Sequence, residues 1–426
     1  MPNQALLEEK RVQYTEPQGS LASPRKALRF SRFIASLLVF ALVCLGLSTV
    51  KFGALPAVDV AYPTWTSWAV SDFLKEKTGR PELVFMGSSL MLVPLDGVDA
   101  DFTGKRIDAS THHKSLFFEK RMKDLTGLDV STFNFALPGE MPSDAFMITR
   151  HLLKADKRPD VIVYGVGPRD FMDNLLPSPA ATDPFRHLER FGDYHDRIDL
   201  IAPKWEERLS YEMRRACYPL GVSADLQNGA ARATANVLSQ LFPLTRKPDI
   251  HKRRLLLPDY HGMEIQLGEC YFRPTTAKDR TAFTDNVEEY RKRYKTLKWD
   301  TFLAQMQFVA DICNIAQNRG IEVVLVAMPI TDINRGLLSD DAWAAYTDTL
   351  KALATSKKAT FIDMHATGQF PRSDFGDTVH LHSGGGARLL DMIARKISKE
   401  HKVLSALDIR RDETDRSLAG LKESQL

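Results

Sequence analysis

Residues 161–171 read VIVYGVGPRDF, and this stretch decides the fold. Its first six residues form a mostly apolar run, which is typical of a strand buried on both faces of a parallel sheet. Similar runs alternate along the chain with segments of helical periodicity, the pattern of parallel strands joined by crossover helices. Strands are expected at residues 83–86, 129–135, 161–166, 323–328 and 360–362.

Helical periodicity marks the segments between these strands. Within residues 301–319, apolar side chains recur at spacings of three and four, which predicts a helix with one buried stripe. The stripe consists of Phe302, Met306, Val309, Cys313 and Ala316. Helices are expected at residues 113–125, 143–153, 301–319, 340–356 and 383–398. The body of the chain is therefore expected to be an α/β domain built on a parallel sheet.

The N-terminus carries a candidate membrane anchor. Residues 33–50 contain no charged side chain, and with residues 51–55 they are just long enough to cross a bilayer core of about 30 Å. Basic residues precede the run, so the positive-inside rule predicts a cytoplasmic tail over residues 1–32 and an exported body. A cleaved signal peptide and a buried core helix are the alternatives. We expect a single-pass protein of the bacterial inner (cytoplasmic) membrane.

The distribution of charge supports this topology. The chain has a formal net charge of +3, and residues 1–32 alone hold six basic and three acidic side chains. The remaining 394 residues are therefore neutral overall, which argues against a nucleic-acid partner. The four cysteines form no C-x-x-C pair and indicate neither a disulfide scaffold nor a zinc ribbon. Cys217 and Cys270 would have the chance to pair in an oxidising compartment, but free buried thiols are the simpler expectation.

The expected body is interrupted once. Residues 56–171 and 301–400 carry the α/β pattern, whereas residues 172–300 break it and are expected to form an insertion or cap. The insertion contains a basic run at residues 246–254 and a basic amphipathic stretch at residues 288–298. Both are either solvated faces or local contacts for anionic lipid or an acidic polymer. Residues 401–426 are polar and are expected to be a loosely held tail.

Polar residues follow the strands at the edge where ligands of parallel sheets bind. Gly87-Ser88-Ser89 follows the first strand, Asn134 ends the second strand, and Gly139 follows it. Each group alone also fits an ordinary helix cap or strand-exit turn. At the end of residues 161–166, Arg169 is placed to donate to an oxyanion or a carboxylate, or to form a structural ion pair with a neighbouring aspartate.

The last polar group lies near the C-terminus. Asp377 and His380 are three residues apart, so the carboxylate can orient the imidazole as a general base. The alternative is a surface contact without a catalytic role. His382 follows two residues later, and together with Asp377 and His380 it also suggests a metal site, although no fourth ligand is placed by spacing. No cofactor or metal is expected.

Taken in order, these blocks resemble the SGNH/GDSL hydrolase superfamily. Its Gly-Asp-Ser block corresponds to Gly87-Ser88-Ser89 and implies Ser89 as nucleophile, with Ser88 as the fallback. Its oxyanion glycine corresponds to Gly139. Its Asp-x-x-His-Leu block is matched in full by residues 377–381, which implies a triad of Ser89, His380 and Asp377. The resemblance implies a flavodoxin-like, three-layer α/β/α fold with a central parallel sheet, and it covers about residues 81–171 and 321–398.

Two residues depart from the family pattern. Ser88 stands where the family has Asp, and Arg169 stands where it has the oxyanion Asn. Gly-Ser-Ser beside an N-terminal anchor resembles exported SGNH-like partners of membrane-bound O-acyltransferases. That resemblance implies an esterase or O-acyltransferase acting on acyl, chiefly acetyl, esters of a cell-surface or exported polysaccharide through an acyl-enzyme. The alternative is a non-catalytic scaffold or polysaccharide-binding partner of such a transferase.

Overall fold

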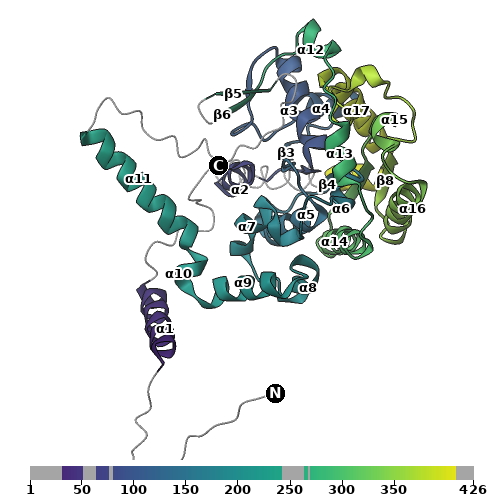
Figure 1. Cartoon of the computed structure of the whole chain (residues 1–426). Coiled ribbons are helices and arrows are strands. Elements are labelled where there is room, and N and C mark those ends of the chain that lie inside the picture. The colour runs from purple at the N-terminus through teal and green to yellow at the C-terminus, as the bar shows by residue number, and fades with distance from the viewer. Residues whose placement is uncertain (1–30, 51–63, 76–79, 242–262, 267–268, 409–426) are drawn as a thin grey trace, which may run out of the picture.

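A computed structural model describes residues 31–50, 64–75, 80–241, 263–266 and 269–408 of the chain (Figure 1). At its centre is a five-stranded sheet in the order β3-β1-β4-β7-β8, and every neighbouring pair is parallel. The strands are β1 (Leu83–Gly87), β3 (Thr132–Asn134), β4 (Val161–Val166), β7 (Glu322–Ala327) and β8 (Thr360–Asp363). All residues of β1 and β4 are buried, as expected for continuous apolar runs covered on both faces.

Helices cover both faces of this sheet. One layer contains α3 (Ser89–Thr103), α4 (Leu116–Thr126) and α17 (Ser383–Ile397), which pack against one another. The opposite layer contains α5 (Pro142–His151), α14 (Trp299–Asn318) and α16 (Asp340–Ser356) (Figure 1). The predicted three-layer α/β/α architecture with a central parallel sheet is confirmed. The expected apolar stripe of α14, from Phe302 to Ala316, is buried.

A smaller sheet and two short helices flank this core. Antiparallel strands in the order β2-β6-β5 form the smaller sheet, with bounds β2 (Ile107–Asp108), β5 (Met263–Gln266) and β6 (Glu269–Phe272). Helix α2 (Trp65–Lys75) lies beside the β3 edge, where Phe73 contacts Phe133 and Phe135. Helix α15 (Asp332–Arg335) follows β7, and 3-10 turns occur at Ala155–Lys157, Pro179–Ala181, Glu189–Phe191, His195–Arg197 and Arg372–Asp374.

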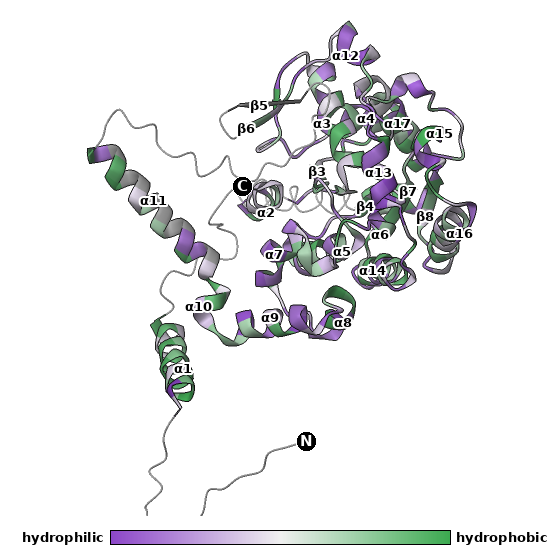
Figure 2. Cartoon of the chain, in the orientation of Figure 1, coloured by the Kyte–Doolittle hydropathy of each residue, from purple (hydrophilic) through white to green (hydrophobic). Residues whose placement is uncertain are grey.

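Most of the chain between β4 and α14 is helical. Its elements are α6 (Arg169–Met172), α7 (Asp183–Leu188), α8 (Ile198–Ile201), α9 (Trp205–Ala216), α10 (Tyr218–Gly221), α11 (Ser223–Leu241), α12 (Ala277–Thr281) and α13 (Val287–Arg293). Figure 2 shows that α9 and α11 carry both polar and apolar residues along their length. The basic run at residues 246–254 lies outside the described residues.

The expected anchor corresponds to α1 (Arg32–Val50), and residues 1–30 and 51–63 lie outside the described residues. Of the helices described, α1 alone is long and apolar enough to cross a membrane. It packs against α10, where Sγ of Cys44 lies 2.7 Å from Sγ of Cys217. All four cysteines are free thiols, and Cys270 is buried in a separate cluster around β2 and β6.

The C-terminal prediction is wrong in its first part. Residues 401–408 are helical, and Val403 and Leu407 are buried in the main core. The sequence suggested a loose tail because residues 401–426 are mostly polar and only a few apolar side chains interrupt them. The burial of Val403 and Leu407 nevertheless holds residues 401–408 against the domain. The rest of the expected tail, residues 409–426, lies outside the described residues.

Candidate active site

The turn between β1 and α3 presents Ser89 at the carboxyl edge of the sheet. Gly87 has φ of +139°, and a Cβ atom there would lie 2.4 Å from the carbonyl oxygen of Gly165 on β4. Glycine is therefore required for this close approach. Ser88 then takes an extended N-cap conformation and Ser89 becomes the first residue of α3. The Ser89 amide is one of the helix N-terminal N–H groups that lack an intrahelical acceptor.

Three residues from opposite ends of the chain form a hydrogen-bonded series. Oγ of Ser89 lies 2.8 Å from Nε2 of His380, and Nδ1 of His380 lies 2.6 Å from Oδ2 of Asp377. Ser89 is partly exposed, whereas the His380 side chain is 8% exposed. A hydroxyl, an imidazole and a carboxylate in this order have the geometry of a serine nucleophile with its base and orienting acid.

The electrostatics of Asp377 suit an ionised carboxylate. Burial raises the pKa of its carboxyl, but attraction to His380 and hydrogen bonds from His380 and Val379 lower it by more, so the pKa lies below its ordinary value. Oδ1 accepts the backbone N–H groups of Val379 and His380 at 2.8 and 2.7 Å. The Asp377 carboxylate therefore stabilises the turn from residue 377 to residue 380 through Oδ1 and orients the imidazole of His380 through Oδ2.

The loop between Asp377 and His380 is held from outside as well. The Thr378 carbonyl accepts from the backbone N–H and the hydroxyl of Thr331, at 3.2 and 2.7 Å. Oδ1 of Asn286 accepts from the Thr378 backbone N–H at 3.2 Å, and Nδ2 of Asn334 donates to Oγ1 of Thr378 at 3.0 Å. Thr378 is fully buried, so these contacts fix the position of the loop that carries His380.

Ser88 forms its side-chain hydrogen bond with Asp170, not with His380. Its side chain is 3% exposed, and its hydroxyl donates to Oδ2 of Asp170 at 3.4 Å. The same carboxylate oxygen accepts the Gly167 backbone N–H at 2.8 Å. Burial raises the pKa of Asp170 to about 6, against the opposing effect of Arg169. Ser88 thus links two strand ends, and Ser89 is the hydroxyl that reaches the imidazole.

Gly139 and Arg169 lie together beside the serine. Gly139 has φ of +75°, and a Cβ atom placed there would lie 3.4 Å from Nη2 of Arg169. Arg169 is itself held by Asp173, with Nε 2.9 Å from Oδ2, so the structural ion pair considered from the sequence is present. Both residues line the same cavity as Ser89 and His380.

This site cavity has a volume of about 200 Å³ and lies among the ends of β1, β4 and the Asp377–His380 loop. One wall comes from α13 and its flanks, through Asn286, Tyr290, Arg293 and Tyr294. These residues were not expected in the site, because the basic stretch at residues 288–298 was interpreted as a solvated face or a contact for anionic lipid or polymer. Arg293 is instead ion-paired with Asp173, the same carboxylate that holds Arg169.

Glu140 was also missed, although it follows Gly139 directly. Its side chain is 1% exposed and burial raises the pKa of its carboxyl well above the ordinary value. Nearby Asp144 and Asp170 raise that pKa further. Burial therefore favours the protonated, neutral form of the Glu140 carboxyl in the folded protein.

Two predicted site residues lie outside the site cavity. Asn134 is buried, accepts the Ala136 backbone N–H at 2.8 Å and donates to Asp96 at 3.4 Å, so it shapes the exit from β3. His382 caps α17: Nδ1 accepts from the Gly384 backbone N–H at 3.0 Å, and Nε2 donates to the Ser373 carbonyl. With both of its ring nitrogens engaged, His382 is a poor metal ligand. The described residues contain no cluster suited to a metal ion.

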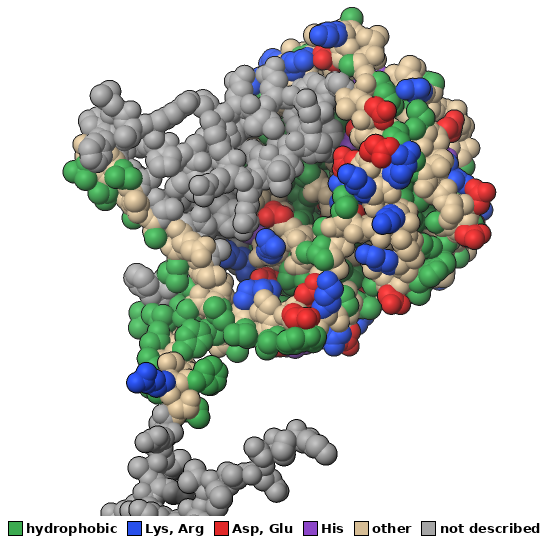
Figure 3. Space-filling model, in the orientation of Figure 1, with side chains coloured by type: hydrophobic (Ala, Val, Ile, Leu, Met, Phe, Trp, Pro, Cys, Tyr) green, Lys and Arg blue, Asp and Glu red, His purple; other side chains and the backbone are tan. Residues whose placement is uncertain are grey.

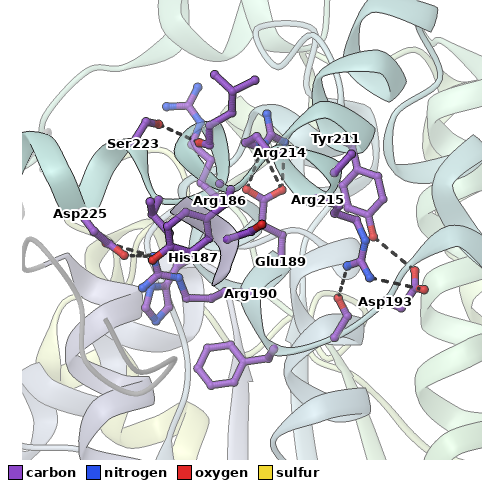
Figure 4. Close-up of a pocket in the computed structure, with 18 of the residues that line it drawn as sticks. Arg186, His187, Glu189, Arg190, Asp193, Tyr211, Arg214, Arg215, Ser223 and Asp225 are labelled. Atoms are coloured by element: carbon purple, nitrogen blue, oxygen red, sulfur yellow. Dashed lines mark hydrogen bonds and ion pairs between the residues drawn. The ribbon is translucent and has the colours of Figure 1, made fainter. Parts of the chain in front are cut away.

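A larger cavity of about 920 Å³ lies among α7, α9, α10 and α11 and shares no lining residue with the site cavity (Figure 4). Its arginines are mostly paired: Arg190 with Asp225, Arg214 with Glu189 and Arg215 with Asp193. Its histidine, His187, has a pKa lowered to about 3 by burial and by Arg190, so it stays uncharged. The described wall offers no serine–histidine pair, and we place the chemistry in the smaller cavity.

No protein-family model matches the chain, and no curated protein sequence matches it. Similar solved structures include a GDSL-like lipase from Bacteroides thetaiotaomicron, with 8% identity and a TM-score of 0.33, covering 79% of this chain and 98% of that one. Another is a catalytic mutant of an acetylxylan esterase from Geobacillus stearothermophilus, with 10% identity and a TM-score of 0.33, covering 77% and 98%. Similarity this weak carries no functional inference, so the site rests on its own geometry.

Proposed function

We propose that this protein is a membrane-anchored, extracytoplasmic serine esterase or O-acyltransferase that works through an acyl-enzyme. The main support for this proposal is the series of hydrogen bonds that joins Ser89, His380 and Asp377. The nucleophile lies at a helix N-terminus at the carboxyl edge of a parallel sheet, where ligands of such sheets bind. The substrate class follows from the resemblance noted in the sequence: acyl, chiefly acetyl, esters of a cell-surface or exported polysaccharide.

The proposed reaction has two steps, acylation of Ser89 and deacylation. Ser89 Oγ attacks the acyl carbon while Nε2 of His380 takes its proton, and the alcohol leaves with that proton. Water or a sugar hydroxyl then attacks the acyl-Ser89 ester and gives its proton to His380. As the bond between the acyl carbon and Oγ breaks, His380 returns that proton to Oγ and the Ser89 hydroxyl is restored. Asp377 holds the imidazole tautomer and stabilises its positive charge in both steps.

The developing oxyanion is assigned to the Ser89 and Gly139 amides, assisted by Arg169. One donor of this kind is worth about 3–4 kcal/mol in acyl-transfer sites. Arg169 lies beside Gly139, and its positive charge would stabilise an oxyanion. The Arg169 guanidinium also forms an ion pair with Asp173. A capped site would favour transfer to a hydroxyl over hydrolysis by excluding water, and the wall formed by α13 is the candidate cap.

Turnover of p-nitrophenyl acetate by the purified full chain tests this function. We expect slow release of p-nitrophenol that is lost in Ser89→Ala and His380→Ala. Ser88→Ala is the matched control, because Ser88 is one residue away and points to Asp170. Equal rates in wild type and Ser89→Ala would contradict the proposal.

A non-catalytic scaffold that binds polysaccharide for a membrane-bound O-acyltransferase is the second candidate. One observation favours it: Arg169 replaces the family's oxyanion asparagine and is committed to Asp173. If the protein is a scaffold, wild type and Ser89→Ala should bind acetylated polysaccharide equally well. Neither protein should then hydrolyse p-nitrophenyl acetate or the acetyl esters of the polysaccharide. Release of acetate from the polymer, lost in Ser89→Ala, would exclude it.

A further inference from the structure

Helix α9 exposes a row of large apolar side chains. Trp205, Leu209 and Met213 are 69%, 49% and 42% exposed, and we call these three residues the α9 stripe. Because they are spaced four residues apart, they lie along one face of the helix. Large apolar side chains that gather on one exposed face mark a surface for contact with a membrane or a partner.

The opposite face of α9 holds the helix to the body. Tyr211 is buried there and its hydroxyl accepts the Tyr194 backbone N–H at 3.1 Å. On the same side, Arg214 pairs with Glu189 and Arg208 donates to the Ala202 carbonyl. The usual arrangement of an amphipathic helix is thus reversed, with its apolar face outward. The body packs against α9 without covering the stripe.

The position of α1 indicates what covers the stripe. Cys44 of α1 contacts Cys217, which directly follows α9. Only residues 45–50 of α1 follow Cys44, about 9 Å of helix at 1.5 Å per residue. A helix that spans the bilayer core needs about 20 residues, so an inserted α1 would lie largely within the bilayer. The segment that contacts Cys44 is therefore held at the level of the membrane.

Helix α9 lies at the end of the body that faces α1 (Figure 1). Figure 1 shows α9 running across the direction of α1, with α10 between them. Figure 3 shows hydrophobic side chains along the lower edge of the body over α9 and α10, continuous with those of α1. A helix that lies in the membrane plane beside a spanning helix has this arrangement.

We propose that α9 lies on the outer surface of the bilayer that α1 spans, with Trp205, Leu209 and Met213 inserted among the lipid headgroups and first acyl carbons. Glu206 and Glu212 border the stripe, so the contact is apolar and needs no anionic lipid. The contact, together with α1, holds the body in one orientation above the membrane. It goes beyond the proposed esterase function and rests only on α1 being inserted.

A fluorophore attached at position 209 tests this contact in the full chain. The native cysteines are replaced, and a single Leu209→Cys is labelled with an environment-sensitive dye and reconstituted into phosphatidylcholine vesicles. Phe102→Cys is the matched control, because Phe102 is 48% exposed on α3, in the helix layer across the sheet from α5 and α14. Phe40→Cys in α1 reports insertion of the anchor. Circular dichroism during heating shows that each variant is folded.

Two quenchers distinguish the outcomes. We expect a doxyl-labelled lipid to quench position 209 several-fold more than position 102, and aqueous iodide to do the reverse. Iodide quenching at both positions would overturn the proposal in favour of a solvated face. Protection of position 209 from both quenchers would overturn it in favour of a protein interface. Absence of lipid quenching at position 40 would overturn the anchor and the proposal together, without bearing on ester turnover.

Discussion

The carboxyl edge of the central sheet and the outer face of α9 treat side chains in opposite ways. At the sheet edge, polar groups such as Asp170 and Thr378 are buried, and hydrogen bonds hold them. On α9, apolar groups such as Trp205 and Leu209 are exposed. Both arrangements reverse the usual distribution of residues between core and surface. Under the two proposals, the buried polar groups position the reacting side chains, whereas the exposed apolar face positions the body on a membrane.

The first prediction concerns the sheet edge and has the largest expected effect. Asp377→Asn should lower kcat/KM for an acetyl ester about ten-thousand-fold, because the amide no longer holds the required imidazole tautomer. The loop also loses a charged acceptor, so the unfolding temperature is measured in parallel. A loss of less than about tenfold in a folded variant would show that His380 works without Asp377.

A matched pair of leucines compares the two regions directly. Leu325 is fully buried in β7, and Leu325→Ala should lower the free energy of unfolding by about 2–5 kcal/mol. Leu209 is 49% exposed, and Leu209→Ala in detergent should change it by less than about 0.5 kcal/mol. Chemical denaturation of both variants measures this. An equal loss in the two variants would mean that the α9 stripe packs within the protein.

Asn286 tests whether the insertion positions the catalytic loop. Asn286→Ala should lower kcat for an acetyl ester, by less than Asp377→Asn does, because Thr378 loses an external contact while the three reacting groups remain. KM should change little, and Asn286→Asp, which keeps the acceptor oxygen, should restore part of kcat. A change confined to KM would instead assign Asn286 to substrate binding.

Glu140 gives the smallest effect, seen as a pH dependence. The pKa of its carboxyl is raised in the folded state, so folding favours the protonated form. Its contribution to stability is full below the unfolded pKa of about 4.3 and declines as pH rises toward the folded value. Glu140→Gln does not titrate, so its free energy of unfolding should fall less steeply between pH 5 and 9 than that of wild type. Parallel curves from urea denaturation would contradict a raised pKa for Glu140.

Local sequence patterns predicted the sheet well. The strand expected at residues 161–166 and the helix at residues 340–356 coincide with β4 and α16, because each has a clear apolar run or stripe. Helix α3 was not among the helices predicted from the sequence. It contains Pro94 and is buried on nearly all sides, including at Asp96, so its sequence has no one-sided periodicity.

Most of the candidate site was predictable, because its residues either follow strands of one parallel sheet or share one short loop. Asp377 and His380 meet because they share one short loop, and the structure brings Ser89 to them. Asn134 and His382 matched by position but bond to neighbouring backbone amides. Arg293 was unpredictable because its place in the cavity wall depends on how the insertion folds back over the sheet.

Mapping a covalent adduct tests the central claim most directly. The full chain is treated with a fluorophosphonate, digested and analysed by peptide mass spectrometry. We expect an adduct on Ser89 in wild type and in Ser88→Ala, and none in a Ser89→Ala variant that unfolds at the wild-type temperature. An adduct on Ser88, or undiminished labelling of Ser89→Ala, would contradict it.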